Sequence, residues 1–338
     1  MTTRYAVVHA NPQGPGDARP TALQIIADED LTNKLQSTKI LITGASSGIG
    51  VETAKALFTT GATLYLTARN LEKARAALGE EIAQSPRVHL LELNLESLDS
   101  VRVCAKNVLS LTETLNIFIG NAGIMATPEG KTKDGFELQF GTNYLSHFLL
   151  FVLLRPALLA GTAAPGPSGT STPSRVILLS SIAHRYSEVQ FDNINFENGT
   201  YDKWAAYGQS KCAMLWLANE IDRRYSEQGI RAFSVQPGGI QTGLLQHMSE
   251  EEKKGLSDDP ALGPQFKSPQ QGAATSVWGA VSKALEGNGG VYLEDVQIAK
   301  AWDEKEGQWA PGYFPHAFSP EKERRLWEVS IGLVRVQE

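Results

Sequence analysis

The sequence predicts a doubly wound α/β fold, in which a seven-stranded parallel sheet carries helices on both faces. Three observations support this prediction. From Lys39 onward, short β-branched and aliphatic runs alternate with longer amphipathic runs, which is the pattern of βαβ units. The short runs are apolar almost throughout, as expected of strands that are covered on both faces. The first of them leads directly into a glycine-rich segment that opens a helix.

The strands are predicted from seven short apolar runs. In chain order they are KILIT from residue 39, TLYLT from 63, VHLLE from 88, NIFIG from 116, RVILLS from 175, IRAFSVQ from 230 and VYLE from 291. Residues 1–38 are predicted to be an N-terminal extension with one short helix in TALQIIADEDLTNKL, and residues 39–338 to be the catalytic domain. Residues 161–174 are Gly, Pro, Ser, Thr and Ala without periodicity, which predicts a surface loop.

The composition is that of a soluble globular protein. The 338 residues are 42% hydrophobic and 20% charged, which is enough to bury one large core or two modest ones. The net charge of -6 disfavours a nucleic-acid partner, because phosphate binding needs concentrated Lys and Arg. Cys104 and Cys212 lie in helical segments without CxxC spacing, so we expect neither a disulfide framework nor a metal site.

One apolar stretch raises the question of a membrane span. Residues 148–160, FLLFVLLRPALLA, are interrupted by Arg155 and Pro156 after seven residues, so we interpret them as part of a buried core helix. The N-terminal residues contain no long apolar run, and we expect neither a signal peptide nor a membrane span. We therefore expect a cytoplasmic protein, and the sequence leaves open whether it is a monomer or a homo-oligomer.

The glycine-rich segment TGASSGIG, residues 43–50, lies between the first strand and a helix that begins near Gly48. Small residues let the backbone approach a ligand, and a helix N-terminus offers N–H donors to a phosphate. A glycine turn alone can be structural, but its position after the first strand of a βαβ series favours a Rossmann-type nucleotide site. The residues of this segment assigned to cofactor binding are Gly44, Ser46, Ser47, Gly48 and Ile49.

The end of the second strand bears on which dinucleotide is bound. A chain that binds NAD normally presents a carboxylate there to the ribose 2'-hydroxyl, whereas this chain has TARN. Arg69 carries a planar fork suited to a 2'-phosphate, and we expect no carboxylate beside it. The alternative is a solvated surface arginine. We interpret Arg69 as favouring NADP(H).

Six motifs in order resemble those of the short-chain dehydrogenase/reductase family. They are TGASSGIG, GNAG at 120–123, FGTNYLSHF at 140–148, SSIAH at 180–184, YGQSK at 207–211 and PGGIQT at 237–242. The resemblance runs from about Lys39 to Leu293. The segments LTARN, FGTNYLSHF and SSIAH are most similar to its retinol-dehydrogenase-like and WW-domain-oxidoreductase-like branch, especially fungal members with long N-termini.

The resemblance implies a catalytic tetrad of Asn143, Ser181, Tyr207 and Lys211. Each member also has a chemical reason to be present. A carbonyl that receives a hydride needs a proton, and Tyr207 lies four residues before Lys211. On a helix the ammonium, with the oxidised nicotinamide nearby, should lower the pKa of the phenol. Ser181 follows the fifth strand and can donate to the substrate oxygen. In the family, Asn143 holds a water that relays protons to the lysine, which itself holds the nicotinamide ribose.

The remaining motifs imply further cofactor contacts. In the family, GNAG supports the central strands and lines the cofactor, the strand end LNLES lies near the adenine, and PGGIQT lies against the nicotinamide amide and the phosphate. The residues assigned on this basis are Asn94, Leu95, Asn121, Ala122, Gly123, Pro237, Gly238, Ile240 and Thr242. We expect His147 and His184 to be packing or substrate-loop residues rather than ligands.

Residues 243–267 follow PGGIQT, and we expect them to form a lid over the active site. Leu244, Leu245 and Met248 would share an apolar face, which either roofs a pocket for a hydrophobic small molecule or pins the lid to the core. The sequence thus predicts an NADPH-dependent carbonyl reductase or alcohol dehydrogenase acting on a hydrophobic small molecule, in secondary metabolism. The alternatives are a catalytically silent NADP-binding scaffold or sensor, and an imine or double-bond reductase that uses the same site.

Overall fold

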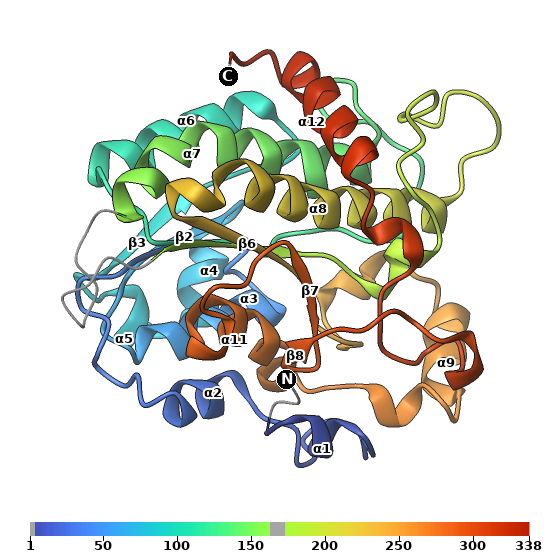
Figure 1. Ribbon diagram of the computed structural model, residues 1–338, viewed down its shortest axis with the longest axis horizontal. Helices are drawn as coiled ribbons and strands as arrows, with labels where there is room; N and C mark the ends of the chain where they lie inside the picture. The colour runs from blue at the N-terminus through green and yellow to red at the C-terminus, as the bar shows by residue number, and fades with distance from the viewer. Residues whose placement is uncertain (1–3, 163–172, 338) are drawn as a thin grey trace.

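The computed structural model describes residues 4–162 and 173–337 and shows a central sheet between two layers of helices (Figure 1). The described residues form eight strands in the order β3-β2-β1-β4-β5-β6-β7-β8. The strands are β1 Lys39–Thr43, β2 Thr63–Ala68, β3 Val88–Glu92, β4 Ile117–Gly120, β5 Ser174–Leu179, β6 Ile230–Gln236, β7 Val291–Glu294 and β8 Gln297–Ile298. Strands β1 to β7 pair in parallel, as predicted.

The expected count of seven strands is one too low, because β8 adds a short antiparallel strand to the edge of the sheet. A two-residue turn, Asp295 and Val296, reverses the chain, and both residues have positive φ angles of 52° and 56°. Such angles are unfavourable for a β-branched residue, so local propensity does not predict this turn. Tertiary contacts hold it: Asp295 forms an ion pair with Lys267, and the Val296 N–H donates to Thr275 Oγ1 at 3.2 Å.

Two hydrophobic clusters cover the two faces of the sheet. One joins the sheet to α6 (Leu98–Leu111), α7 (Ser146–Thr162), α8 (Lys203–Tyr225) and α12 (Pro320–Val334). The other joins it to α2 (Ala22–Asp28), α3 (Gly48–Phe58), α4 (Leu71–Leu78), α5 (Glu80–Ala83) and α11 (Ala274–Val281). Figure 1 shows α7 and α8 on one side of the strands and α3 and α11 on the other. Burial on both faces explains why the strand sequences are apolar throughout.

The apolar stretch at 148–160 lies in α7 and is part of the core, as predicted. Among the described residues, the helical run Phe140–Thr162 is the one that is long and apolar enough to cross a membrane. However, 67% of its most apolar window is buried inside the structure, which is typical of a core helix. Helix α7 continues to Thr162 and β5 begins at Ser174, so the predicted loop at 161–174 lies, for residues 163–172, outside the described residues.

The N-terminal extension contains the predicted helix and a second one that was not predicted. Thr21 caps α2 by accepting the Gln24 N–H, and the buried Ile25 and Ile26 face the rest of the protein. The unpredicted helix is α1 (Ala6–His9), a single turn too short to give a periodic signal. Residues 4–38 are thus packed on the α3 and α11 side of the sheet (Figure 1).

Candidate active site

The site lies at the carboxyl ends of the strands, where the order of the sheet reverses. Strand β1 has β2 on one side and β4 on the other, and a crevice opens at such a switch point. A cavity of about 800 Å³ lies there, within the size range of sites for large small-molecule ligands. Every residue predicted to bind the cofactor lines this cavity, and so do Ser181, Tyr207 and Lys211.

The glycine-rich loop adopts a conformation that needs its glycines. Gly44 and Gly48 have φ angles of 77° and 60°, in the left-handed region. A Cβ on Gly44 would lie 2.9 Å from Ala122, so a side chain there would collide with the neighbouring loop. Helix α3 begins at Gly48, and the side chain of Ser47 makes no capping hydrogen bond to it. The first-turn N–H groups can therefore face a phosphate in the cavity.

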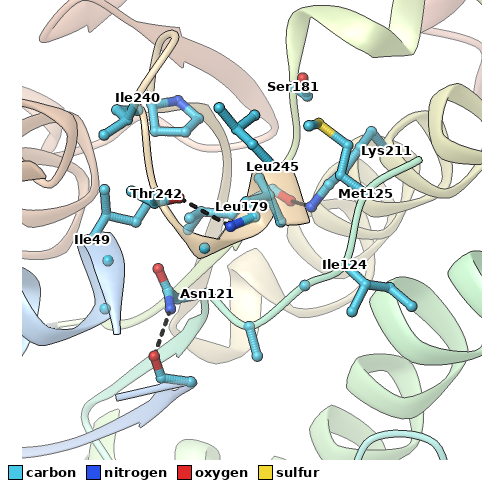
Figure 2. Close-up of a pocket in the computed structure, with 18 of the residues that line it drawn as sticks. Ile49, Asn121, Ile124, Met125, Leu179, Ser181, Lys211, Ile240, Thr242 and Leu245 are labelled. Atoms are coloured by element: carbon cyan, nitrogen blue, oxygen red, sulfur yellow. Dashed lines mark hydrogen bonds between the residues drawn. The ribbon is translucent and has the colours of Figure 1, made fainter. Parts of the chain in front are cut away.

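Asn121 ties the first and fourth strands together and leaves one polar atom without a protein partner. Its Nδ2 donates to the carbonyl of Thr43 at 2.8 Å, and its backbone N–H donates to Thr43 Oγ1 at 3.0 Å. Its Oδ1 is buried and has no hydrogen-bond partner in the described part of the chain. A buried acceptor of this kind indicates that a ligand completes the site. Figure 2 shows Asn121 and Ile49 on the side of the cavity opposite Lys211.

The expectation that no carboxylate stands beside Arg69 is wrong. Glu96 Oε1 lies 2.9 Å from Arg69 Nη1, and both side chains line the cavity. The two residues are 27 positions apart, and the pairing of β2 with β3 brings them together. Asn94 helps to fix Glu96 because its Oδ1 accepts the Glu96 N–H at 3.0 Å. Lys73, which the sequence did not suggest, adds a second cation to this end of the cavity.

Tyr207 and Lys211 lie one turn apart on α8 and are buried together. The Lys211 Nζ lies 5.7 Å from the centroid of the Tyr207 ring and donates to the carbonyl of Leu179 at 3.0 Å. Leu179 is the last residue of β5, so this bond fixes the lysine against the strand end that precedes Ser181 (Figure 2). The structure thus brings the predicted tyrosine, lysine and serine together at one end of the cavity.

Burial dominates the protonation state of Tyr207. Burial raises the pKa of Tyr207 to about 12, and the Ser181 hydroxyl beside it lowers that pKa by a smaller amount. Burial also lowers the pKa of Lys211 to about 8. Among the protein's own groups, removal from water disfavours both charges and dominates. The lowering of the phenol pKa expected from Lys211 together with the oxidised nicotinamide stays a prediction. At neutral pH Tyr207 is a neutral phenol that can donate a proton.

Asn143 lies behind the cavity rather than on its wall. It belongs to a π-helical segment, Phe140–Leu145, that leads into α7. Its Oδ1 accepts the N–H of Ile124 at 2.8 Å, and its Nδ2 donates to the carbonyl of Ile124 and to Ser210 Oγ, both at 2.9 Å. Its side chain therefore positions the chain that follows the GNAG motif and also contacts α8. The expected water relay through Asn143 stays a prediction.

Histidines position the strand ends, as expected of packing residues. His184 Nε2 accepts the Phe314 N–H at 3.1 Å, so Nδ1 carries the proton and donates to the carbonyl of Ser181 at 2.7 Å. His147 Nε2 lies 2.9 Å from Thr43 Oγ1, and its Nδ1 lies 2.8 Å from the carbonyl of Asn143. Burial lowers the pKa of His147 to about 4 and of His184 to about 3, so both are neutral.

The expected lid segment, residues 243–267, lines the cavity near Tyr207. It forms a 3-10 helix, Gly243–His247, followed by α9 (Glu250–Asp258). Leu244, Leu245 and Met248 belong to a small apolar cluster that contains Met125, Ala126, Ala183, Trp204, Tyr207 and Leu256. Figure 2 shows Leu245 at the same end of the cavity as Met125 and Ser181. An ion pair of 2.6 Å between Lys203 and Glu252 joins α9 to the start of α8.

A C-terminal segment that the sequence did not suggest also lines this end of the cavity. Trp309 and Pro311 come from more than a hundred residues beyond Ser181. Arg185 holds their segment by donating to the carbonyls of Gln308 and Ala310 at 3.2 and 2.8 Å. The Trp309 Nε1–H donates to Asp259 Oδ2 at 2.9 Å, next to the end of α9. No local pattern predicts these contacts, because they depend on distant partners.

Known proteins are similar to this chain in sequence and in fold. The sequence model of the short chain dehydrogenase family matches residues 38–192. The short-chain dehydrogenase/reductase prx1 of Penicillium rubens is 46% identical over 338 residues, covering 99% of this chain and 96% of that protein. Retinol dehydrogenase 13 of Mus musculus is 37% identical over 301 residues, covering 87% of this chain and 83% of that protein.

A solved structure of an uncharacterized protein from Mycobacterium paratuberculosis is also similar, with a TM-score of 0.66 and 29% sequence identity. The similarity covers 89% of this chain and 94% of that chain. The likeness therefore extends over most of both chains. The chain belongs to the short-chain dehydrogenase/reductase family of nicotinamide-dependent oxidoreductases, in its retinol-dehydrogenase-like branch with fungal members.

Proposed function

We propose that this protein is an NADP(H)-dependent oxidoreductase that transfers a hydride between the nicotinamide and the carbonyl or alcohol of a hydrophobic small molecule. One observation carries the proposal: Tyr207 and Ser181 share a single cavity with the glycine-rich loop and with an apolar cluster from residues 243–267. A proton donor, a phosphate-binding turn and an apolar wall are the three parts that such a reaction needs.

The dinucleotide fits the residues that line the cavity. The N-terminus of α3 would hold the phosphates, Asn121 Oδ1 would accept a hydrogen bond, and Arg69 with Lys73 would face the 2'-phosphate. Glu96 competes for Arg69, so we expect the preference for NADPH over NADH to be moderate. The bound cofactor supplies the hydride in reduction and accepts it in oxidation.

The residues of the chain handle the proton and the substrate oxygen. In reduction, the Tyr207 phenol donates its proton to the carbonyl oxygen as that oxygen gains negative charge. The Ser181 hydroxyl donates a hydrogen bond to the same oxygen and lowers the pKa of Tyr207. The Lys211 ammonium, held by the carbonyl of Leu179, stabilises the phenolate that forms. Because Tyr207 is protonated at neutral pH, it can act as the acid in carbonyl reduction.

The substrate end of the cavity fits a bulky apolar molecule. Its walls include Met125, Trp204, Leu245 and Leu256, with Trp309 from the C-terminal segment. A small polar metabolite would leave this surface in contact with water, whereas a large apolar ketone or alcohol would cover it. The name of retinol dehydrogenase 13 specifies retinol, an apolar alcohol, and this supports the same substrate class for the related chain. We place that chemistry in secondary metabolism.

Replacing the proton donor should abolish turnover and leave cofactor binding intact. We expect Tyr207→Phe to lower kcat at least about 100-fold, since general acid catalysis contributes that much or more. The measurement is NADPH oxidation with a bulky apolar ketone, together with the Kd for NADPH. Tyr186→Phe is the matched control, because Tyr186 also lines the cavity but is 54% exposed and should keep its activity. Full activity in Tyr207→Phe would rule out this acid.

Carbonyl reduction should depend on pH through Lys211. With a pKa of about 8, Lys211 is charged below that pH and neutral above it, while Tyr207 stays protonated throughout. We expect kcat/KM for reduction to be level from about pH 6 to 7 and to fall about tenfold per pH unit well above 8. The pH profile is to be measured with saturating NADPH. A rate that instead rises above pH 8 would contradict the assignment.

The Arg69–Glu96 pair should tune cofactor preference in opposite directions. Arg69→Ala should weaken NADPH binding about tenfold and NADH binding little, because it removes a charge-assisted bond to the 2'-phosphate. Glu96→Gln should strengthen NADPH binding by up to about fivefold, the range of an exposed ion pair. Titration of both cofactors tests this, with Arg75→Ala as control because Arg75 does not line the cavity. If the ratio of the Kd for NADPH to the Kd for NADH were unchanged in both variants, the proposed role of the Arg69–Glu96 pair would be refuted.

The apolar end should select for bulky substrates. Leu245→Ser should lower kcat/KM for a large apolar ketone about five- to tenfold, since it exposes part of a leucine-sized surface to water. The same variant should change kcat/KM for a small polar ketone little. Leu23→Ser, on the half-exposed face of α2, is the control. A wild-type preference for the small polar ketone, or an equal loss on both substrates, would contradict the proposed substrate class.

A further inference from the structure

The loop that follows β6 rests on the segment that ends the expected lid. The N–H of Lys267 donates to the carbonyl of Gly239 at 2.9 Å, and Lys267 pairs with Ile240 in a short parallel bridge. A Cβ on Gly239 would lie 3.3 Å from the ring of Phe266. Residues 237–240, which are the expected nicotinamide loop, thus pack on Phe266 and Lys267.

The side chain of Lys267 fixes the same loop from a buried position. Lys267 is 4% exposed, and its Nζ donates to the carbonyl of Pro237 at 3.2 Å. Asp295, in the turn between β7 and β8, balances its charge at 2.6 Å. Gly238 has a φ of 107°, and a Cβ on it would lie 2.8 Å from the Lys267 side chain. The loop therefore follows the position of Lys267 closely.

The N-terminal extension grips the residues just before Lys267. Arg19 is 4% exposed, and its guanidinium donates to the carbonyls of Gln265 and Phe266 at 2.9 and 2.6 Å. It also donates to the carbonyls of Pro264 at 3.3 Å and Gly14 at 3.1 Å. Its Nε lies 2.8 Å from Asp17 Oδ1, which balances the charge. A planar fork with five donors suits several carbonyls that converge in this way.

The extension also grips the residues just after Lys267. Gln271 Oε1 accepts the N–H of Gly16 at 2.8 Å, and its Nε2 donates to the carbonyls of Asp17 and Arg19 at 3.1 and 3.0 Å. His9 adds a contact from α1, with its Nε2 3.9 Å from Asp295 Oδ1. Residues 14–19 thus hold both sides of Lys267, more than 240 positions away in the sequence. Figure 1 shows the N-terminal helices α1 and α2 on the side of the sheet that carries α3 and α11.

We propose that residues 14–19 form an N-terminal clamp that positions the loop Pro237–Ile240 through Lys267, with Arg19 as its central positioning residue. The proposal rests on the proposed dinucleotide function of the cavity. The clamp acts on the part of the cavity that follows β6 and includes no residue of the glycine-rich loop, Arg69 or Asn94. It therefore sets the affinity for the nicotinamide half of NADPH and leaves the affinity for the adenosine half unchanged.

The test compares the whole cofactor with a fragment. Arg19→Met keeps the length of the side chain and removes its donors. We expect it to raise the Kd for NADPH about tenfold, because the loop Pro237–Ile240 would no longer be held in its binding conformation. The Kd for adenosine 2',5'-bisphosphate, which lacks the nicotinamide, should change less than about twofold. A selective loss of this kind is not expected from general destabilisation, which would weaken the binding of both probes.

Matched variants make the test decisive. Arg4→Ala removes an ion pair to Asp28 in the same extension, and this pair does not involve residues 264–271. The Kd values of this variant for NADPH and for adenosine 2',5'-bisphosphate should therefore match those of the wild type. If Arg19→Met does not fold, Gln271→Ala loosens the clamp without leaving a buried charge, and the same selective loss is expected. Equal weakening of both probes, or no change in either, overturns the clamp. Failure of wild type to bind NADPH would instead overturn the proposed function.

Discussion

The burial of a lysine beside a tyrosine is the constraint on which the rest of the site depends. Lys211 lies in the protein interior, and a buried ammonium is stable only where polar groups replace the water it has lost. The carbonyl of Leu179, at the end of β5, supplies one such group. This bond ties α8 to the strand that carries Ser181. The pKa of Lys211 falls to about 8 and that of Tyr207 rises to about 12 because both are buried.

The cavity is completed by segments that are distant in sequence. Strand ends supply the glycine-rich loop, Asn121 and Ser181, which parallel pairing would bring to one edge in any doubly wound sheet. The substrate end depends on longer connections, which are residues 243–267 and the segment around Trp309. Each is anchored by side chains that donate to backbone carbonyls, as Arg185 and Arg19 do. The strand ends and α8 thus position the chemical groups, and the anchored segments shape the cavity around them.

The sequence predicts the sheet and the residues of the site better than it predicts their surroundings. Seven strands are recovered within one residue at their ends, because burial on both faces makes each an apolar run. The partner of Arg69 was missed because Glu96 becomes its neighbour only through the pairing of β2 with β3. The rise in the pKa of Tyr207 on burial was not foreseen, because spacing on a helix reports proximity to Lys211 but not burial. Trp309 and Arg19 carry no local signal.

Two ion pairs that line the cavity show how exposure determines what a charge can do. Arg69 and Glu96 are in contact with solvent, and such a pair contributes little to stability, so Arg69 can exchange its partner for a phosphate at small cost. Lys267 is buried and Asp295 is partly buried, so separating them would leave the charge of Lys267 uncompensated in the interior. The exposed pair is therefore suited to choosing a ligand, whereas the buried pair is suited to holding a loop in one position. An ion pair that water reaches can thus help to select a ligand, whereas an ion pair that is shielded from water can fix the position of a loop.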